Sequence, residues 1–146
     1  MDILPDTSAV IDGRVSERIK ADDFEGTVYI PEAVVGELEA QANDGRDSGW
    51  EGLEELQRLA DLADGGTVEI RYVGRRTKPS ESSGAYEGDI DALIRSVAEE
   101  EGATLLTSDV VQSEVARAKG IDVDYVEPRV RGSGGLIIED FFDEQT

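Results

Sequence analysis

Residues 89–109 of the chain, DIDALIRSVAEEEGATLLTSD, carry a helical pattern, a glycine, an apolar strand and an acid in direct succession. The apolar residues at 90, 93, 94, 97 and 98 recur with helical spacing, and Gly102 ends that pattern. The apolar run 103–106 then predicts a strand, with Asp109 just beyond its end. A helix that leads at once into an apolar strand is typical of α/β proteins with a parallel sheet.

The same alternation extends over the rest of the chain. We expect strands at 3–4, 27–30, 68–72 and 121–126, and helices at 32–43, 48–63 and 110–119. Pro31 suits the first turn of a helix, and residues 74–88, rich in Gly, Pro, Ser and Thr, predict an exposed loop. Strands that alternate with helices predict an α/β fold with a central parallel sheet covered on both faces.

Composition limits the chemistry that this chain can perform. Its 146 residues include neither Cys nor His, which excludes Cys/His zinc sites, disulfides and histidine-based catalytic triads. Catalysis must then depend on carboxylates, hydroxyls, Lys, Arg, Tyr or a metal with oxygen ligands.

The net charge of −20, from 14 basic and 34 acidic residues, is the second compositional signal. Such an excess of carboxylates is tolerable at about 1 M salt, where the Debye length is only roughly 3 Å. We therefore hypothesise a halophilic organism; the alternative is an acidic surface that binds a basic partner. Either way, the charge opposes general nucleic-acid binding, so a polyanionic substrate needs a local basic patch or bridging metal ions.

The length predicts one domain, residues 1–127, followed by a linker and C-terminal extension at 128–146. The chain has no apolar run of about 18 residues and no signal-peptide pattern at its start, so we expect a cytoplasmic protein that does not contact a membrane.

Among 34 acids, position after an apolar strand selects the candidates. Asp6 and Asp109 each follow a predicted strand, where ligands bind in open α/β sheets. Asp91 is predicted in the first turn of its helix, where the helix dipole favours an anion, although it could equally be a capping residue like Asp89. Glu37 lies within the apolar stripe of residues 32–43 and could also be an ordinary surface residue.

Four carboxylates that converge cannot all stay ionised without protons or a cation. Mg²⁺ or Mn²⁺ would resolve this and could activate a water for phosphodiester hydrolysis. Ser8 and Thr107 could hydrogen-bond a carboxylate, a metal-bound water or a phosphate; alternatively, Thr7 or Ser8, and Ser108, are helix caps. Asp12, within DGR, could be an outer metal ligand or a turn residue, and we favour the turn.

Four stretches together carry a resemblance to a known family: LPDTSAVIDGR (4–14), PEAVVGELE (31–39), residues 89–109 and AKGIDVDYV (118–126). The chain resembles the PIN domains, which are metal-dependent ribonucleases. The resemblance implies a three-layer α/β/α sandwich and an endoribonuclease that cuts single-stranded RNA. Its acidic quartet corresponds here to Asp6, Glu37, Asp91 and Asp109, with Ser8 and Thr107 in support. Asp6, Asp91 and Asp109 would hold Mg²⁺ or Mn²⁺, and Glu37 would be a ligand or would orient the attacking water.

The DGR, GDIDAL and TSDVVQ elements look closer to archaeal proteins in which a PIN domain precedes a P-loop ATPase and an RNA-binding KH domain than to small toxins. The ending EDFFDEQT resembles the junction with the ATPase, so we expect a chain cut before that domain; the alternative is a short helix that docks Phe141 and Phe142 on the core. No P-loop motif occurs in this sequence. Substrate phosphates would bind the one basic cluster, formed by Arg71, Arg75, Arg76 and Lys78; the alternative is that these residues only make the loop soluble.

Two other functions remain open at this stage. The first is a catalytically weak or inactive module that binds RNA or assembles the homo-oligomer of a larger ATPase. The second is a phosphoacceptor receiver domain, which would need a lysine at the end of a strand. Lys119 is predicted on a helix and Lys78 in a loop, which argues against a receiver domain.

Overall fold

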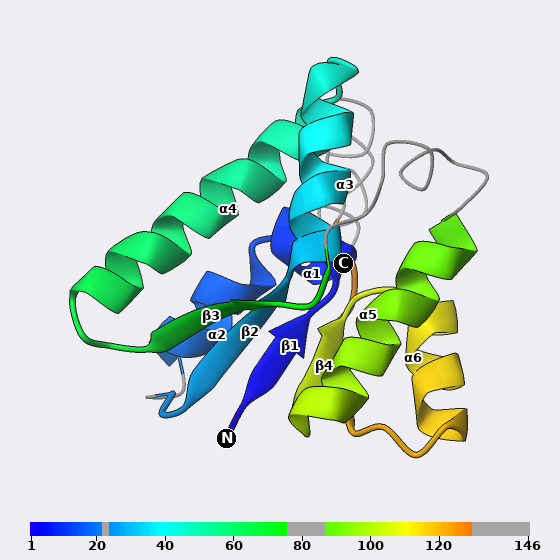
Figure 1. Ribbon diagram of the computed structural model, residues 1–146. Coiled ribbons are helices and arrows are strands. Elements are labelled where there is room, and N and C mark those ends of the chain that lie inside the picture. The colour runs from blue at the N-terminus through cyan, green and yellow to red at the C-terminus, as the bar shows by residue number, and fades with distance from the viewer. Residues whose placement is uncertain (22–23, 76–86, 130–146) are drawn as a thin grey trace, which may run out of the picture.

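Five short strands form the centre of the protein, seen in a computed structural model that describes residues 1–21, 24–75 and 87–129. All strand pairs are parallel, and the order across the sheet is β3-β2-β1-β4-β5 (Figure 1). The strands are β1 (Ile3–Pro5), β2 (Thr27–Pro31), β3 (Glu69–Val73), β4 (Thr104–Thr107) and β5 (Val123–Tyr125).

The chain's most apolar strands lie in the middle of this sheet. Every residue of β1 is buried and so are three of the four in β4, whereas the edge strand β3 is largely exposed. Ile3 pairs with Val28 of β2 on one side and with Thr104 of β4 on the other. Because β1 and β4 are neighbours, the residues that follow them, Asp6 and Asp109, emerge at the same edge of the sheet.

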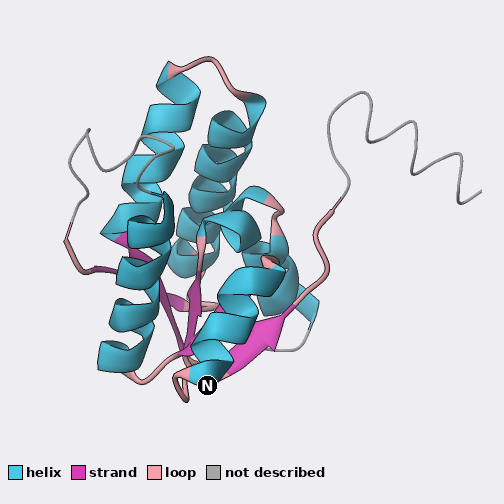
Figure 2. Cartoon of the chain, turned by 90° about the vertical axis from the view of Figure 1, so that its right-hand side faces the viewer, coloured by secondary structure: helices cyan, strands magenta, loops and turns pink. Residues whose placement is uncertain are grey.

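Helices cover both faces of the sheet, as Figure 2 shows from the side. On one face α4 packs against α1, α2 and α3, while on the other α5 packs on β4, and α6 packs on β4 and β5. The predicted α/β/α sandwich is therefore confirmed. The helices are α1 (Thr7–Ile11), α2 (Arg14–Ala21), α3 (Glu32–Asn43), α4 (Asp47–Asp64), α5 (Glu87–Glu101) and α6 (Val110–Ala118).

Helices α3 and α4 form an arm: α3 rises from the end of β2 and α4 returns beside it (Figure 1). Two glycines of α4 allow the close packing. A Cβ at Gly49 would lie 2.3 Å from the backbone nitrogen of Ala42, and one at Gly52 would lie 2.2 Å from a methyl carbon of Leu38. Side chains at these positions would force the two helices apart, so the glycines fix the position of α3 over the sheet.

Three sequence expectations need correction. Helix α5 begins at Glu87 rather than Asp89, and Pro31 ends β2 and precedes α3 instead of lying in its first turn. Helix α2 adds an element that was not predicted, although its buried residues Val15 and Ile19 have helical spacing.

The predicted division into residues 1–127 and 128–146 stays a prediction, because residues 130–146 lie outside the described part of the chain. Among the helices of the described residues, none has the length and apolar character that a membrane span requires.

Candidate functional site

Asp6 is the most enclosed of the four predicted acids, with only 3% of its surface exposed. It follows β1 directly and is the N-cap of α1, where its Oδ1 accepts hydrogen bonds from the Ala9 backbone nitrogen (3.0 Å) and the Ser8 hydroxyl (2.7 Å). Its Oδ2 accepts a 2.5 Å hydrogen bond from the Thr107 hydroxyl at the end of β4. Asp6 is thus fixed by two strands and one helix end.

The charge state of Asp6 depends on opposing effects. Burial raises the pKa of its carboxyl group above the ordinary value, and the neighbouring charge of Asp109 raises it further. The hydrogen bonds from Thr107, Ser8 and the Ala9 backbone act in the other direction, because they stabilise the carboxylate. Ser8 and Thr107 therefore support the charged form of Asp6.

Glu37 lies in the second turn of α3 and approaches the same region from the arm. The Thr7 hydroxyl in α1 donates a 2.5 Å hydrogen bond to its Oε1. Sequence reasoning considered Thr7 only as a cap, and no local pattern marks this contact, since the two residues are 30 positions apart. The hydrogen bond turns Glu37 toward the residues that follow β1.

Asp109 is the N-cap of α6 and accepts hydrogen bonds from the backbone nitrogens of Val111 (2.9 Å) and Gln112 (3.2 Å). Its own backbone nitrogen donates to the Thr107 hydroxyl (3.0 Å). Thr107 consequently contacts two of the acids, Asp6 through its donor and Asp109 through its acceptor. Asp6 and Asp109 cap their helices themselves, so the proposed capping by Thr7, Ser8 or Ser108 is wrong.

The pKa of Asp91 is raised from 3.8 to about 7. Partial burial is the largest cause, followed by the negative charges of Glu37, Asp109 and Asp6, while Arg95 partly offsets them. Because α5 begins at Glu87, Asp91 is its fifth residue and lies beyond the predicted first turn. The helix dipole is therefore not what fixes an acid at this position.

Gln112 joins the two helices that carry Asp91 and Asp109. Its side chain is almost completely buried, donates to the Asp91 carbonyl oxygen (3.2 Å) and accepts from the Arg95 guanidinium (2.5 Å). Sequence reasoning missed Gln112 and Arg95. A signal existed for Gln112, since D-x-x-Q at 109–112 matches the spacing of a helix capping box.

All four acids line one open pocket of about 190 Å³ at the carboxyl edge of the sheet. They come from four places in the fold: the end of β1, α3, α5 and the start of α6. Burial is the largest cause of the raised pKa of Asp91, and the repulsion among the acids adds to it; a bound cation would relieve that repulsion. The pocket is lined by Asp6, Thr7, Ser8, Ile11, Glu37, Asp91 and Asp109.

The side chains that line this pocket fit a hard divalent ion such as Mg²⁺ or Mn²⁺, because their donor atoms are all oxygens. Within residues 1–21, 24–75 and 87–129, no three His, Cys, Asp or Glu side chains already stand in the arrangement of a metal site. Mg²⁺ usually keeps several of its waters, so an ion could be held partly through water-mediated contacts.

Asp12 has a structural role, in line with its interpretation as a turn residue. It is the C-cap of α1, and its Oδ2 accepts hydrogen bonds from the Ser108 hydroxyl (3.1 Å) and the Arg129 backbone nitrogen (3.1 Å). The turn after α1 is thereby tied both to the end of β4 and to the segment that leaves β5.

The predicted basic cluster is only partly described. Arg71 lies exposed on the edge strand β3 and pairs with Glu69 at 2.8 Å. Arg75 is exposed just after β3, whereas Arg76 and Lys78 lie outside the described residues. The role of this cluster in binding phosphates stays a prediction.

Comparisons with known proteins give the family. The PIN domain family matches residues 3–118. A KH and PIN-domain containing protein of Methanocaldococcus jannaschii is 43% identical over 142 residues, which are 97% of this chain and 22% of that protein. The Holliday junction branch migration ATPase PINA of Sulfolobus acidocaldarius is 27% identical over 99% of this chain and 26% of its own length.

A solved structure agrees with this assignment. A domain of a functionally unknown protein from Methanocaldococcus jannaschii superposes with a TM-score of 0.81 at 42% identity, covering 90% of this chain and 94% of that domain. The chain spans about a quarter of the length of the two curated relatives, with coverages of 22% and 26%. On its sequence and its fold, the chain belongs to the PIN domain family.

Proposed function

We propose that this chain is a divalent-metal-dependent endoribonuclease that hydrolyses phosphodiester bonds of single-stranded RNA. The observation that carries the proposal is the pocket in which carboxylates from four separate elements converge at the carboxyl edge of the sheet. The PIN domain is a nuclease-type fold, which supports a general nuclease role. Metal dependence and the preference for RNA are the parts that need testing.

The protein's own residues have distinct tasks in this proposal. Asp6, Asp91 and Asp109 would hold the ion, and the hydrogen bonds from Ser8 and Thr107 favour the charged form of Asp6. Glu37, oriented by Thr7, would be a further ligand or would orient the attacking water. A bound Mg²⁺ or Mn²⁺ would make a water nucleophilic and neutralise charge that develops on the phosphate.

The test uses labelled single-stranded RNA and DNA of the same sequence, incubated in about 1 M KCl with Mn²⁺, Mg²⁺ or a chelator. Wild type is compared with Asp6→Asn, Asp109→Asn and a matched control, Asp61→Asn, which changes an exposed acid of α4. We expect RNA cleavage by wild type and the control, only with a metal. Cleavage that persists in the chelator or in both site variants would overturn the metal site.

A second candidate is a module that binds RNA or assembles a larger ATPase without its own turnover. One observation favours it: no three acids in the described part of the chain already form a metal site. The larger relatives, a KH and PIN-domain containing protein and an ATPase, also provide such a context. Absence of cleavage under every condition, together with retained RNA binding, would support this module.

A further inference from the structure

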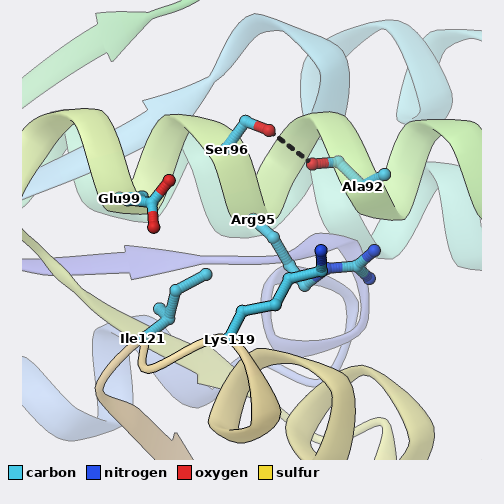
Figure 3. Close-up of a pocket in the computed structure, with 6 residues that line it drawn as sticks. All are labelled: Ala92, Arg95, Ser96, Glu99, Lys119 and Ile121. Carbon is cyan, nitrogen blue, oxygen red and sulfur yellow. Dashed lines mark hydrogen bonds between the residues drawn. The ribbon is translucent and has the colours of Figure 1, made fainter.

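A second pocket lies between α5 and the turn that joins α6 to β5, separate from the acidic one. Its volume is about 130 Å³, and Figure 3 shows its lining side chains. This is more than the space that one water needs, so the pocket can admit a small polar group. The lining residues are Ala92, Arg95, Ser96, Glu99, Lys119 and Ile121.

Two positive charges meet in this pocket in a chain with a net charge of −20. In Figure 3 the side chains of Arg95 and Lys119 reach toward the same end of the pocket, whereas the carboxylate of Glu99 lies at the other end. Neither Lys119 nor Glu99 forms an ion pair with any described residue. Among the side chains that line the pocket, two are cationic and one, Glu99, is acidic.

Arg95 is only partly satisfied by the protein. One of its terminal nitrogens donates to Gln112, but its Nε is buried and has no hydrogen-bond partner among the described residues. A buried guanidinium nitrogen without a partner is costly, but this nitrogen is too enclosed for a ligand in the pocket to reach, so a ligand would have to contact Arg95 through its terminal nitrogens. The Ser96 hydroxyl is not available for this purpose in the observed rotamer, since it donates to the Ala92 carbonyl oxygen.

Arg95 also connects this basic pocket to the acidic one. It lies one helical turn after Asp91 on α5, and its positive charge partly offsets the rise in the pKa of Asp91. Gln112 contacts both, through the Asp91 carbonyl oxygen and the Arg95 guanidinium. Lys119 lies at the opposite end of α6 from Asp109, so a polyanion that reaches the acidic pocket would have to run along α5 and α6 to place a second negative group at Lys119.

We propose that the pocket formed by Arg95 and Lys119 binds a backbone phosphate of RNA that flanks the phosphate presented to the four acids. RNA is chosen as the polyanion because this inference rests on the proposed ribonuclease function. Arginine offers a fork of donors suited to phosphate oxygens, and lysine adds a mobile point charge. The pocket would give this acidic protein the local positive site that nucleic-acid binding demands.

Lys119 provides the cleanest test, because it is exposed at the end of α6 and makes no side-chain hydrogen bond to a described residue. Lys119→Ala is compared with Lys20→Ala, a matched loss of one exposed lysine on α2, and with Lys119→Arg. Thermal melts verify that all variants remain folded. Arg95 is left intact, since its replacement would also alter Asp91 and Gln112.

The measurement is fluorescence anisotropy of labelled single-stranded RNA in a chelator, so that binding is read without cleavage, over a series of KCl concentrations. We expect Lys119→Ala to weaken binding about fivefold and to reduce the slope of log K against log salt by about 0.7. Lys20→Ala should match wild type, and Lys119→Arg should restore most of the affinity. Equal loss in Lys119→Ala and Lys20→Ala would overturn the proposal.

Two further experiments distinguish an RNA phosphate from free inorganic phosphate, and the phosphate site from the proposed nuclease activity. Inorganic phosphate as competitor should displace RNA from wild type more readily than from Lys119→Ala. Phosphate binding that depends on Lys119, with RNA binding that does not, would indicate a free-phosphate site and would also overturn the proposal. RNA binding that depends on Lys119 without any metal-dependent cleavage would uphold the phosphate site and refute the nuclease.

Discussion

Thr107→Val isolates the hydrogen bonds that hold the centre of the acidic pocket. Thr107 is completely buried at the end of β4, where its hydroxyl donates to Asp6 and accepts from the Asp109 backbone nitrogen. Valine has nearly the same shape but lacks the hydroxyl, so the substitution leaves the Asp6 carboxylate and the Asp109 backbone nitrogen without this partner. The change therefore acts on the charge of Asp6 and also on the stability of the fold.

The expected size follows from the hydrogen bond to the carboxylate. A hydrogen bond to a charged group contributes about 1.5–3 kcal/mol, and about 1.36 kcal/mol corresponds to one pKa unit. The hydrogen bond from Thr107 is the largest influence that opposes the effect of burial on Asp6, so its loss should raise the pKa of Asp6 further. A proton then competes more strongly with a metal ion for this carboxylate.

The assay is a titration with Mn²⁺ in about 1 M KCl, with free ion measured by electron paramagnetic resonance across a range of pH. The pH at which half of the Mn²⁺ binding is reached should move upward in Thr107→Val. Thr104→Val, on the same strand and without a side-chain hydrogen bond to the four acids, serves as the control. An unchanged pH midpoint in Thr107→Val would refute the role assigned to Thr107.

Three further outcomes follow from the structure. The pKa of Asp91 is raised from 3.8 to about 7, so metal-free protein should lose stability as pH rises through that window. Asp91→Asn should lack this loss, so near pH 8 its free energy of unfolding in urea should exceed that of wild type. Parallel curves of unfolding free energy against pH for the two proteins would contradict this. Gly49→Ala should lower the free energy of unfolding by about 1–3 kcal/mol in the same urea experiment, because the new Cβ would meet the Ala42 backbone. Gly88→Ala is the control and should show no such loss, because a Cβ at Gly88 meets nothing within 4 Å. The charge of −20 predicts a melting temperature several degrees higher in molar KCl than in low salt, and equal values would argue against salt adaptation.

Strand ends were the most predictable part of the site. Apolar runs at 3–4 and 103–106 predicted β1 and β4, and in a parallel sheet the acids after neighbouring strands emerge at one edge. The helical spacing of 32–43 likewise gave the bounds of α3 and so the place of Glu37. These inferences succeeded because burial imposes a period on the sequence that is visible without coordinates.

Contacts between segments far apart in the chain could not be predicted from the sequence. Thr7 and Glu37 come together only because α3 is held over α1, and Gln112 meets Asp91 only because α5 and α6 lie side by side. The start of α5 was placed two residues late, since the polar residues before Asp89 have no apolar period. The basic pocket was missed for the same reason, since Arg95 and Lys119 are 24 positions apart.

The most direct test of the metal-dependent nuclease is the rate at which Asp6→Asn cleaves single-stranded RNA at saturating Mn²⁺. Asparagine keeps the size of the buried Asp6 side chain but removes the charge at the centre of the four acids. We expect its rate to fall at least about a hundredfold below those of wild type and Asp61→Asn, with the fold retained in a thermal melt. A rate within a few-fold of wild type would contradict hydrolysis at this pocket.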